Sequence, residues 1–226
     1  MRKIKAVLFD LDGTTLYTLK DLHSALNYAL EKNGYAPRTL EQTRLGVGNG
    51  LRKLVKRSLP EGSAPEQEQK VLGDLNGYYA VHLADETVPY EGIPELLEWL
   101  KRDGILVGTV TNKPDVHAGV LMRTCFPGIM DVCVGEREGL PRKPDPALME
   151  AAFRELGVTA EECVYVGDSD VDVETARNCG CRGIGVTWGY RTRQDLRNAG
   201  AELLADTPAE LEKLLRQWMR EENDQQ

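Results

Sequence analysis

The chain has 226 residues, of which 41% are hydrophobic, and this is enough for a packed core in one main domain with a smaller inserted one. Its net charge of -8 and pI of about 5.1 argue against nucleic acid as a partner, because proteins that bind the phosphate backbone carry a basic face. Its apolar runs are too short for a membrane helix or a secretory signal, so we expect a cytoplasmic protein with no membrane partner.

The first predicted strand ends in two acidic residues. Residues 7–9 are apolar, and Asp10 and Asp12 follow them one residue apart, before Gly13. Side chains at positions i and i+2 of an extended chain point to the same side, so these carboxylates repel unless a cation or a shared proton holds them. A divalent metal would offset both charges.

The next part of the chain has helical patterns and no convincing strand. The amphipathic patterns cover residues 19–33, 50–58 and 66–83. Turn residues near Tyr17 and at residues 89–92 mark the two ends of this segment. We therefore predict a helical insertion over residues 17–89, with residues 1–16 and 90–226 forming the main domain.

From residue 104 onward, apolar runs alternate with helical patterns. The predicted strands are residues 105–110, 130–134, 163–166 and 183–187. The predicted helices are residues 114–122, 146–156 and 171–178. Strands and helices in turn predict an α/β fold with a parallel sheet covered by helices on both faces.

Polar residues follow the predicted strands, at the edge of a parallel sheet where ligands bind. In chain order they are Asp10, Asp12, Thr111, Asn112, Lys113, Gly167, Asp168, Ser169, Asp170 and Asp172. A further cation, Lys143, stands beside Pro144 at a predicted helix start. Together these segments predict a site for phosphoryl transfer.

Each residue type suits one part of that chemistry. Carboxylates of Asp10 and Asp168 suit Mg2+, which takes one or two carboxylates together with water and phosphate oxygens. Asp10 can attack phosphorus as a nucleophile, and Asp12 can give a proton to the leaving oxygen and later take one from water. Thr111 and Lys143 would stabilise the charge on the phosphoryl oxygens.

The same segments resemble the four signature motifs of the haloacid dehalogenase (HAD) superfamily of hydrolases, in order, and the pattern is closest to the phosphoglycolate phosphatase-like branch. The matching segments are residues 10–14, 111–112, 143 and 167–172. The resemblance implies a Rossmann-like core with a small inserted helical cap domain, Mg2+ as cofactor and an aspartyl-phosphate intermediate.

The resemblance also implies further roles for individual residues. By motif, Asp12 binds the metal through its backbone carbonyl, and Asp172 holds the metal's waters or orients Lys143. Gly13 and Asn112 are expected to contact the substrate. One position departs from the branch, since Tyr17 and Thr18 stand at the start of the cap where an acidic residue and a serine are common.

The leading prediction is a magnesium-dependent phosphatase for a small phosphorylated metabolite, with 2-phosphoglycolate as the first substrate, in a monomer or homodimer. Arg52, on the predicted helix 50–58, is either part of a solvated helix face or a partner for a carboxylate on the substrate. The alternatives are a phosphatase for nucleotides, pyrophosphate or sugar phosphates, a phosphomutase and, last, a binding module without catalysis. Asp12 argues against a dehalogenase, because cleavage of a carbon–halogen bond needs no acid for an alkoxide.

Overall fold

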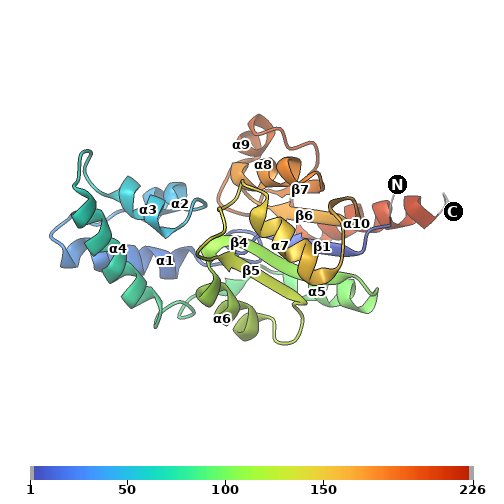
Figure 1. The fold of residues 1–226 in the computed structure, drawn as a ribbon, viewed down its shortest axis with the longest axis horizontal. Helices are drawn as coiled ribbons and strands as arrows, with labels where there is room; N and C mark the ends of the chain where they lie inside the picture. Colours follow the sequence, from blue (N-terminus) through green and yellow to red (C-terminus); the bar gives the residue numbers. More distant parts are fainter. Residues whose placement is uncertain (1–2, 224–226) are drawn as a thin grey trace. The chain divides into compact units, whose positions relative to one another are not determined.

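The structure is a computed structural model that describes the backbone of residues 3–223, so residues 1–2 and 224–226 of the predicted main domain lie outside the described part (Figure 1). The chain divides into two compact units. One combines Met1–Leu16 with Pro89–Gln226, and the other is Tyr17–Val88. We call these the core unit and the inserted unit.

The core unit is built on a parallel sheet. Within residues 3–223 this sheet has six strands in the order β5-β4-β1-β6-β7-β8, and each strand pairs with its neighbours in parallel. The strands are β1 (Ala6–Phe9), β4 (Leu106–Pro114), β5 (Val132–Glu136), β6 (Cys163–Gly167), β7 (Arg182–Val186) and β8 (Leu204–Ala205). The predicted α/β fold class is confirmed.

Helices connect these strands. They are α5 (Ile93–Arg102), α6 (Asp115–Cys125), α7 (Ala147–Leu156), the short 3-10 helix η1 (Ala160–Glu162), α8 (Asp170–Cys179), α9 (Arg193–Asn198) and α10 (Pro208–Asn223). In chain order, β4 and then β5 are added on one side of β1, and β6 and then β7 are added on its other side. Right-handed crossovers therefore place α5 and α6 on one face of the sheet and α7 and α8 on the other.

Strands β1 and β6 are neighbours at the point where the direction of strand addition reverses. All four residues of β1 and all five of β6 are buried, as expected for central strands covered on both faces. Phe9, the last residue of β1, is level with Thr109 of β4 and with Val166 of β6, so β1 and β6 end within one residue of each other, whereas β4 continues to Pro114. Open α/β sheets bind their ligands at such a switch point, beyond the carboxyl ends of the strands.

The inserted unit is helical and is described throughout. Its helices are α1 (Leu19–Lys32), α2 (Leu40–Gly46), α3 (Leu51–Ser58) and α4 (Pro65–Tyr79). Leucines 22, 26 and 30 lie on one face of α1 at a helical spacing and are buried, which explains why this helix folds against its neighbours. The buried side chains of α4, the main partner of α1, are Val71, Leu72, Leu75 and Tyr79.

Two short strands, β2 (Leu16–Tyr17) and β3 (Val88–Pro89), mark the ends of the insertion and pair with each other. The carboxylate of Asp21, near the start of α1, binds the residues that directly precede β3. It accepts hydrogen bonds from the backbone nitrogens of Glu86 (3.0 Å) and Thr87 (2.9 Å) and from the Thr87 hydroxyl (2.7 Å). Asp21 is buried, so it acts as an internal anchor between the two ends of the inserted unit.

Some predicted elements differ from the structure. The insertion has β2 and β3 at its ends although no strand was predicted there, and its last helix stops at Tyr79 instead of residue 83. Strand β4 continues through Pro114, so residues 111–113 belong to the strand instead of following it. In the described residues, no helix combines the length and the apolar character that a membrane crossing requires.

Candidate active site

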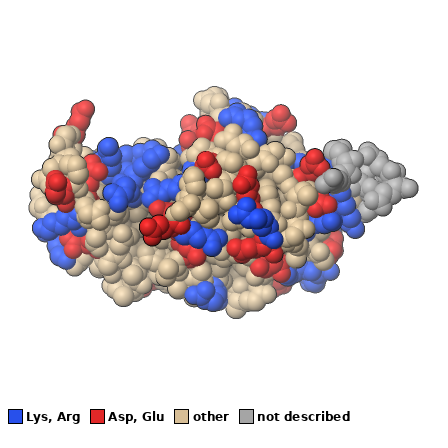
Figure 2. Space-filling model, in the orientation of Figure 1, with Lys and Arg blue, Asp and Glu red and all other residues tan. Residues whose placement is uncertain are grey.

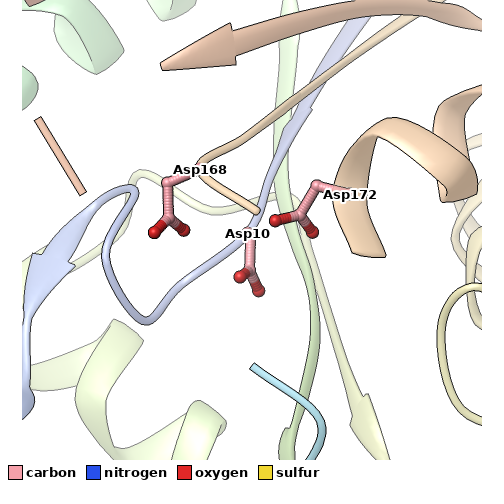
Figure 3. Close-up of side chains that lie close together, drawn as sticks. All are labelled: Asp10, Asp168 and Asp172. Atoms are coloured by element: carbon pink, nitrogen blue, oxygen red, sulfur yellow. The ribbon is translucent and has the colours of Figure 1, made fainter. Parts of the chain in front are cut away.

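Three buried carboxylates converge beyond the ends of β1 and β6 (Figure 3). Asp10 directly follows β1, Asp168 directly follows β6, and Asp172 lies in the first turn of α8. One oxygen from each carboxylate lies within 4.8 Å of the others. The level ends of the two neighbouring strands therefore bring together acidic residues that are far apart in the sequence.

The three carboxylates lie close together in a buried site, and this makes their ionisation less favourable. Burial raises the pKa of Asp10 to about 6, and the charges of Asp172 and Asp12 act in the same direction, while Lys143 opposes them. Burial, followed by the charges of Asp172 and Asp10, also raises the pKa of Asp168 well above its usual range. A divalent cation would remove this excess of charge and keep the carboxylates ionised.

Asp10, Asp168 and Asp172 are the residues that could hold such a cation, and they differ in the contacts that their oxygens already make. Asp172 has both oxygens engaged, one by Lys143 (2.8 Å) and Tyr165 (3.1 Å), the other by the backbone and hydroxyl of Ser169 (3.0 and 2.6 Å). Oδ1 of Asp10 is buried and receives no hydrogen bond of normal geometry, although the Lys143 ammonium lies 2.9 Å from it. A pair of hard carboxylate donors beside a third, supporting carboxylate fits Mg2+.

The carboxylate of Asp168 is enclosed on several sides. Its Oδ1 accepts a hydrogen bond from the Thr14 hydroxyl (3.0 Å), and its Oδ2 accepts one from the backbone nitrogen of Tyr190 (2.6 Å). Gly13 and Gly189 both approach it so closely that a Cβ at either position would overlap it, and Gly13 has a φ of 87°. These contacts fix the orientation of one candidate metal ligand.

Gly13 thus has a clear structural reason to be glycine. Its backbone nitrogen donates a hydrogen bond to the carbonyl of Leu16 (3.0 Å), within the turn that follows Asp12. The contact of Gly13 with the substrate stays a prediction.

Lys143 supplies the positive charge beside this cluster. Its ammonium nitrogen lies 2.9 Å from Oδ1 of Asp10, 2.8 Å from Oδ1 of Asp172 and 2.6 Å from the hydroxyl of Tyr165. Burial alone would lower the pKa of Lys143, but the charges of Asp10 and Asp172 outweigh it and raise the pKa. Lys143 is therefore a buried cation at neutral pH.

Asn112 holds the backbone of Lys143 in place. Its Oδ1 accepts a hydrogen bond from the Lys143 nitrogen (2.8 Å), and its Nδ2 donates one to the Lys143 carbonyl (3.0 Å). The expected contact of Asn112 with the substrate stays a prediction. These hydrogen bonds connect the end of β4 to the segment that carries Lys143.

Tyr165 is a member of the site that the sequence analysis missed. It lies in the middle of β6, and its buried hydroxyl accepts a hydrogen bond from Lys143 while it lies 2.9 Å from the carbonyl of Val110 and 3.1 Å from Asp172. The hydroxyl has one proton, so it can donate to only one of these two acceptors at a time. A polar group inside an otherwise apolar strand was the one signal that pointed to it.

The second aspartate, Asp12, pairs with Lys113. The Lys113 ammonium lies 3.0 Å from Oδ1 and 3.4 Å from Oδ2 of Asp12. Thr111 is buried, and its hydroxyl accepts a hydrogen bond from the backbone nitrogen of Lys113 (3.3 Å). The core unit thus holds every predicted catalytic and metal-binding residue, together with a buried lysine to which the sequence assigned no role.

Arg52 belongs to the inserted unit. It is exposed on α3, and its guanidinium donates a hydrogen bond to the side chain of Gln69 (3.3 Å). Figure 2 shows Lys and Arg side chains gathered on the surface over α3, where the sequence has Arg52, Lys53, Lys56 and Arg57.

Comparison with protein families gives one match that covers most of the chain. The model of the haloacid dehalogenase-like hydrolases matches residues 7–186. A phosphoglycolate phosphatase of Pseudomonas putida is 32% identical over 212 residues, which are 91% of this chain and 75% of the relative. A phosphoglycolate phosphatase of Cereibacter sphaeroides is 38% identical over 192 residues, which are 82% of this chain and 86% of the relative.

Solved structures show the same similarity in three dimensions. A provisionally assigned phosphoglycolate phosphatase of Lactobacillus delbrueckii subsp. bulgaricus superimposes with a TM-score of 0.89 at 36% identity, over 95% of this chain and 99% of that one. CbbY of Rhodobacter sphaeroides, solved in complex with phosphate, gives a TM-score of 0.76 at 28% identity, over 92% of this chain and 96% of that one.

Proposed function

The chain belongs to the haloacid dehalogenase-like hydrolases, and we propose that it is a magnesium-dependent phosphatase that hydrolyses small phosphomonoesters, with 2-phosphoglycolate as its substrate. The observation that carries this proposal is the pairing of a buried carboxylate, Asp10, with the buried cation Lys143 beside a second candidate metal ligand, Asp168. A nucleophile, a cation and metal-binding oxygens are the parts that phosphoryl transfer requires. The names of the two curated relatives support the choice of substrate.

In the first step, a carboxylate oxygen of Asp10 attacks phosphorus. A bond forms between Asp10 and phosphorus, and the ester P–O bond breaks with its electron pair moving to the leaving oxygen. Asp12 donates a proton to that oxygen, so that glycolate leaves with a neutral hydroxyl group. The product on the protein is an aspartyl phosphate.

In the second step, a water molecule attacks the phosphorus of the aspartyl phosphate. Asp12 accepts a proton from this water, and the bond between Asp10 and phosphorus breaks, which returns the carboxylate and releases inorganic phosphate. Lys143 and the hydroxyl of Thr111 stabilise the phosphoryl oxygens in both steps. Asp172, Tyr165 and Asn112 keep Lys143 in position, as their contacts with it indicate.

Asp10, Asp168 and the backbone carbonyl of Asp12 would hold Mg2+. The chemistry that Mg2+ supplies when bound is neutralisation of these carboxylates and of the anionic phosphoryl group. The raised pKa values of Asp10 and Asp168 support this proposal, because burial disfavours the charged form of both carboxylates and a nearby cation would favour it.

We assign the inserted unit the role of a cap that selects the substrate. Its α3 helix carries the basic residues around Arg52, and a cation in a cap would bind the carboxylate of phosphoglycolate. The paired strands β2 and β3 would be the hinge, because both connections between the units pass through them.

The proposal is tested by hydrolysis of a panel of phosphate compounds with Mg2+ and with chelator. We expect kcat/KM to be highest for 2-phosphoglycolate, above pyrophosphate, nucleotides, sugar phosphates and para-nitrophenyl phosphate. Asp10→Asn should abolish hydrolysis of all of them. A middle rank for phosphoglycolate would remove the assigned substrate only, whereas full activity of Asp10→Asn or of the chelated enzyme would remove the mechanism.

A further inference from the structure

We propose that Lys113 is a positioning residue for proton transfer, which holds the carboxylate of Asp12 in the orientation from which it protonates the leaving oxygen. The inference rests on the proposed function in one respect, the role of Asp12 as the acid. The observation behind it is a buried ion pair between the two side chains, with the Lys113 nitrogen 3.0 Å from Oδ1 and 3.4 Å from Oδ2 of Asp12. This single ammonium contacts both oxygens of the carboxylate.

An irregularity in β4 places Lys113 at this point. Val110 pairs with Val134 of β5, and Pro114 pairs with Glu136, so residues 111–113 stand opposite the single residue Gly135. Extra residues in one strand of a pair form a bulge, which redirects side chains and often occurs beside active sites. The bulge is held from within, because the backbone nitrogen of Lys113 donates a hydrogen bond to Thr111.

The contact with Asp12 and the exposure of the two side chains favour a role that acts through the carboxylate. The Lys113 side chain is 1% exposed, whereas the side chain of Asp12 is 14% exposed. Asp12 is therefore the more accessible member of the pair. We expect Lys113 to act on the reaction through Asp12, and the KM of the Lys113 variant tests this.

The two buried lysines of the site have separate partners. Lys143 contacts Asp10 and Asp172, on the side of the nucleophile, and Lys113 contacts Asp12, on the side of the acid. Asp10 and Asp12 are two residues apart and both carry negative charge when ionised. Because each carboxylate has its own lysine, Asp12 stays paired with Lys113 and does not turn toward Lys143, the partner of Asp10.

This role predicts an effect that depends on the leaving group. Glycolate and other alkoxides leave poorly without a proton, whereas para-nitrophenolate leaves readily without one. Removal of Lys113 should therefore slow the hydrolysis of alkyl phosphates strongly and that of para-nitrophenyl phosphate much less. A residue that only stabilises the fold would affect both esters equally.

The experiment compares Lys113→Met with wild type in the full chain loaded with Mg2+, using 2-phosphoglycolate and para-nitrophenyl phosphate. We expect kcat/KM for phosphoglycolate, which reports on the step in which the leaving group departs, to fall by about 10- to 100-fold, with KM nearly unchanged and with a loss of kcat/KM at least about tenfold smaller for the aryl ester. Lys113→Arg, which keeps the charge, should recover part of the rate. The matched control is Lys101→Met, a lysine paired with Asp131 at the surface of the core unit.

Equal losses for both esters would overturn the inference, and so would a rise in KM without a fall in kcat, which would make Lys113 a substrate contact. Circular dichroism and thermal melting show whether Lys113→Met folds. If it does not, the comparison of the two esters is made with Lys113→Arg, for which an unchanged ratio of the two rates would overturn the inference. A wild-type protein inactive on both esters would overturn the proposed function, and with it any role for an acid.

Discussion

The ammonium of Lys143 lies 2.9 Å from Oδ1 of Asp10, inside a core in which both side chains are almost fully buried. In this pair, the positive charge of Lys143 partly offsets the negative charge of the proposed nucleophile. It does not offset the burial completely, because the pKa of Asp10 is still raised to about 6. In the protein without metal, ionisation of Asp10 is therefore less favourable in the folded chain than in the unfolded chain, and we expect this to lower the stability of the fold.

The raised pKa of Asp10 predicts that the metal-free protein loses stability as the pH rises. Well below pH 3.8 the carboxyl is protonated in both the folded and the unfolded chain, so it does not affect stability. Between pH 3.8 and about 6 the unfolded chain ionises more readily than the folded chain, which favours unfolding. The loss at pH 7.5 is on the order of 2–3 kcal/mol, from 1.36 kcal/mol for each pKa unit. Asp10→Asn should remove it and raise Tm by several degrees in chelator.

The comparison of the two proteins is made by thermal unfolding in chelator at pH 7.5 and pH 4.5. The advantage of Asp10→Asn should shrink at the lower pH. Addition of Mg2+ at pH 7.5 should stabilise wild type more than the variant, because binding to the folded state alone raises its stability. A variant less stable than wild type at pH 7.5 in chelator would contradict the interpretation of the acidic cluster.

Tyr165 is expected to matter through its hydroxyl alone. Tyr165→Phe keeps the ring in the core but removes the acceptor for Lys143, so the ammonium loses one of three fixed contacts. We expect kcat to fall by about tenfold with little change in KM, and the free energy of unfolding to fall by roughly 1–2 kcal/mol. Steady-state kinetics and urea unfolding measure these effects, with Tyr78→Phe in the inserted unit as the control. A normal kcat in the Tyr165 variant would show that the contacts with Asp10 and Asp172 are enough to hold Lys143.

The fold was predictable because its central strands are long apolar runs that end in polar residues. The runs before Asp10 and Asp168 correspond to β1 and β6, and their order along the chain, with helices between them, was enough for the α/β class. Strand β8 has two residues and α9 has six, and elements this short have no periodic pattern to detect. The helix α2 was missed for the same reason, although its capping box, formed by Thr39 and Gln42, is a local signal in the sequence.

The site was harder to predict than the fold where side-chain direction decides a role. Asn112 and Lys113 were recognised as polar residues near a strand end, but the bulge in β4 determines that one contacts the backbone of Lys143 and the other contacts Asp12. Tyr165 lies within an apolar run that also fits a purely structural strand. Its role depends on the distance from its hydroxyl to Lys143, which only the folded chain provides.

Arg52 provides a test of the proposed cap. If its guanidinium binds the substrate carboxylate, Arg52→Ala should raise KM for 2-phosphoglycolate by about 10- to 100-fold, since hydrogen bonds to charged groups contribute about 1.5–3 kcal/mol. Ethyl phosphate has no carboxylate and should keep its KM. Arg44→Ala is the control, because Arg44 lies in the same unit and pairs with Glu41 at the surface. An unchanged KM for phosphoglycolate would make α3 a solvated face and leave the chemistry of the core unit untouched.

Asp21 should prove important for the stability of the inserted unit. Its buried carboxylate accepts hydrogen bonds from two backbone nitrogens and one hydroxyl at Glu86 and Thr87, and Asp21→Ala would leave these donors without a partner. We expect a loss of about 2–4 kcal/mol in the free energy of unfolding, with faster amide exchange at residues 86 and 87. Asp85→Ala is the matched control, because Asp85 is exposed and pairs with His82 at the surface of the same unit. Equal stability of the two variants would mean that the pairing of β2 with β3, and not Asp21, holds the segment before β3 in place.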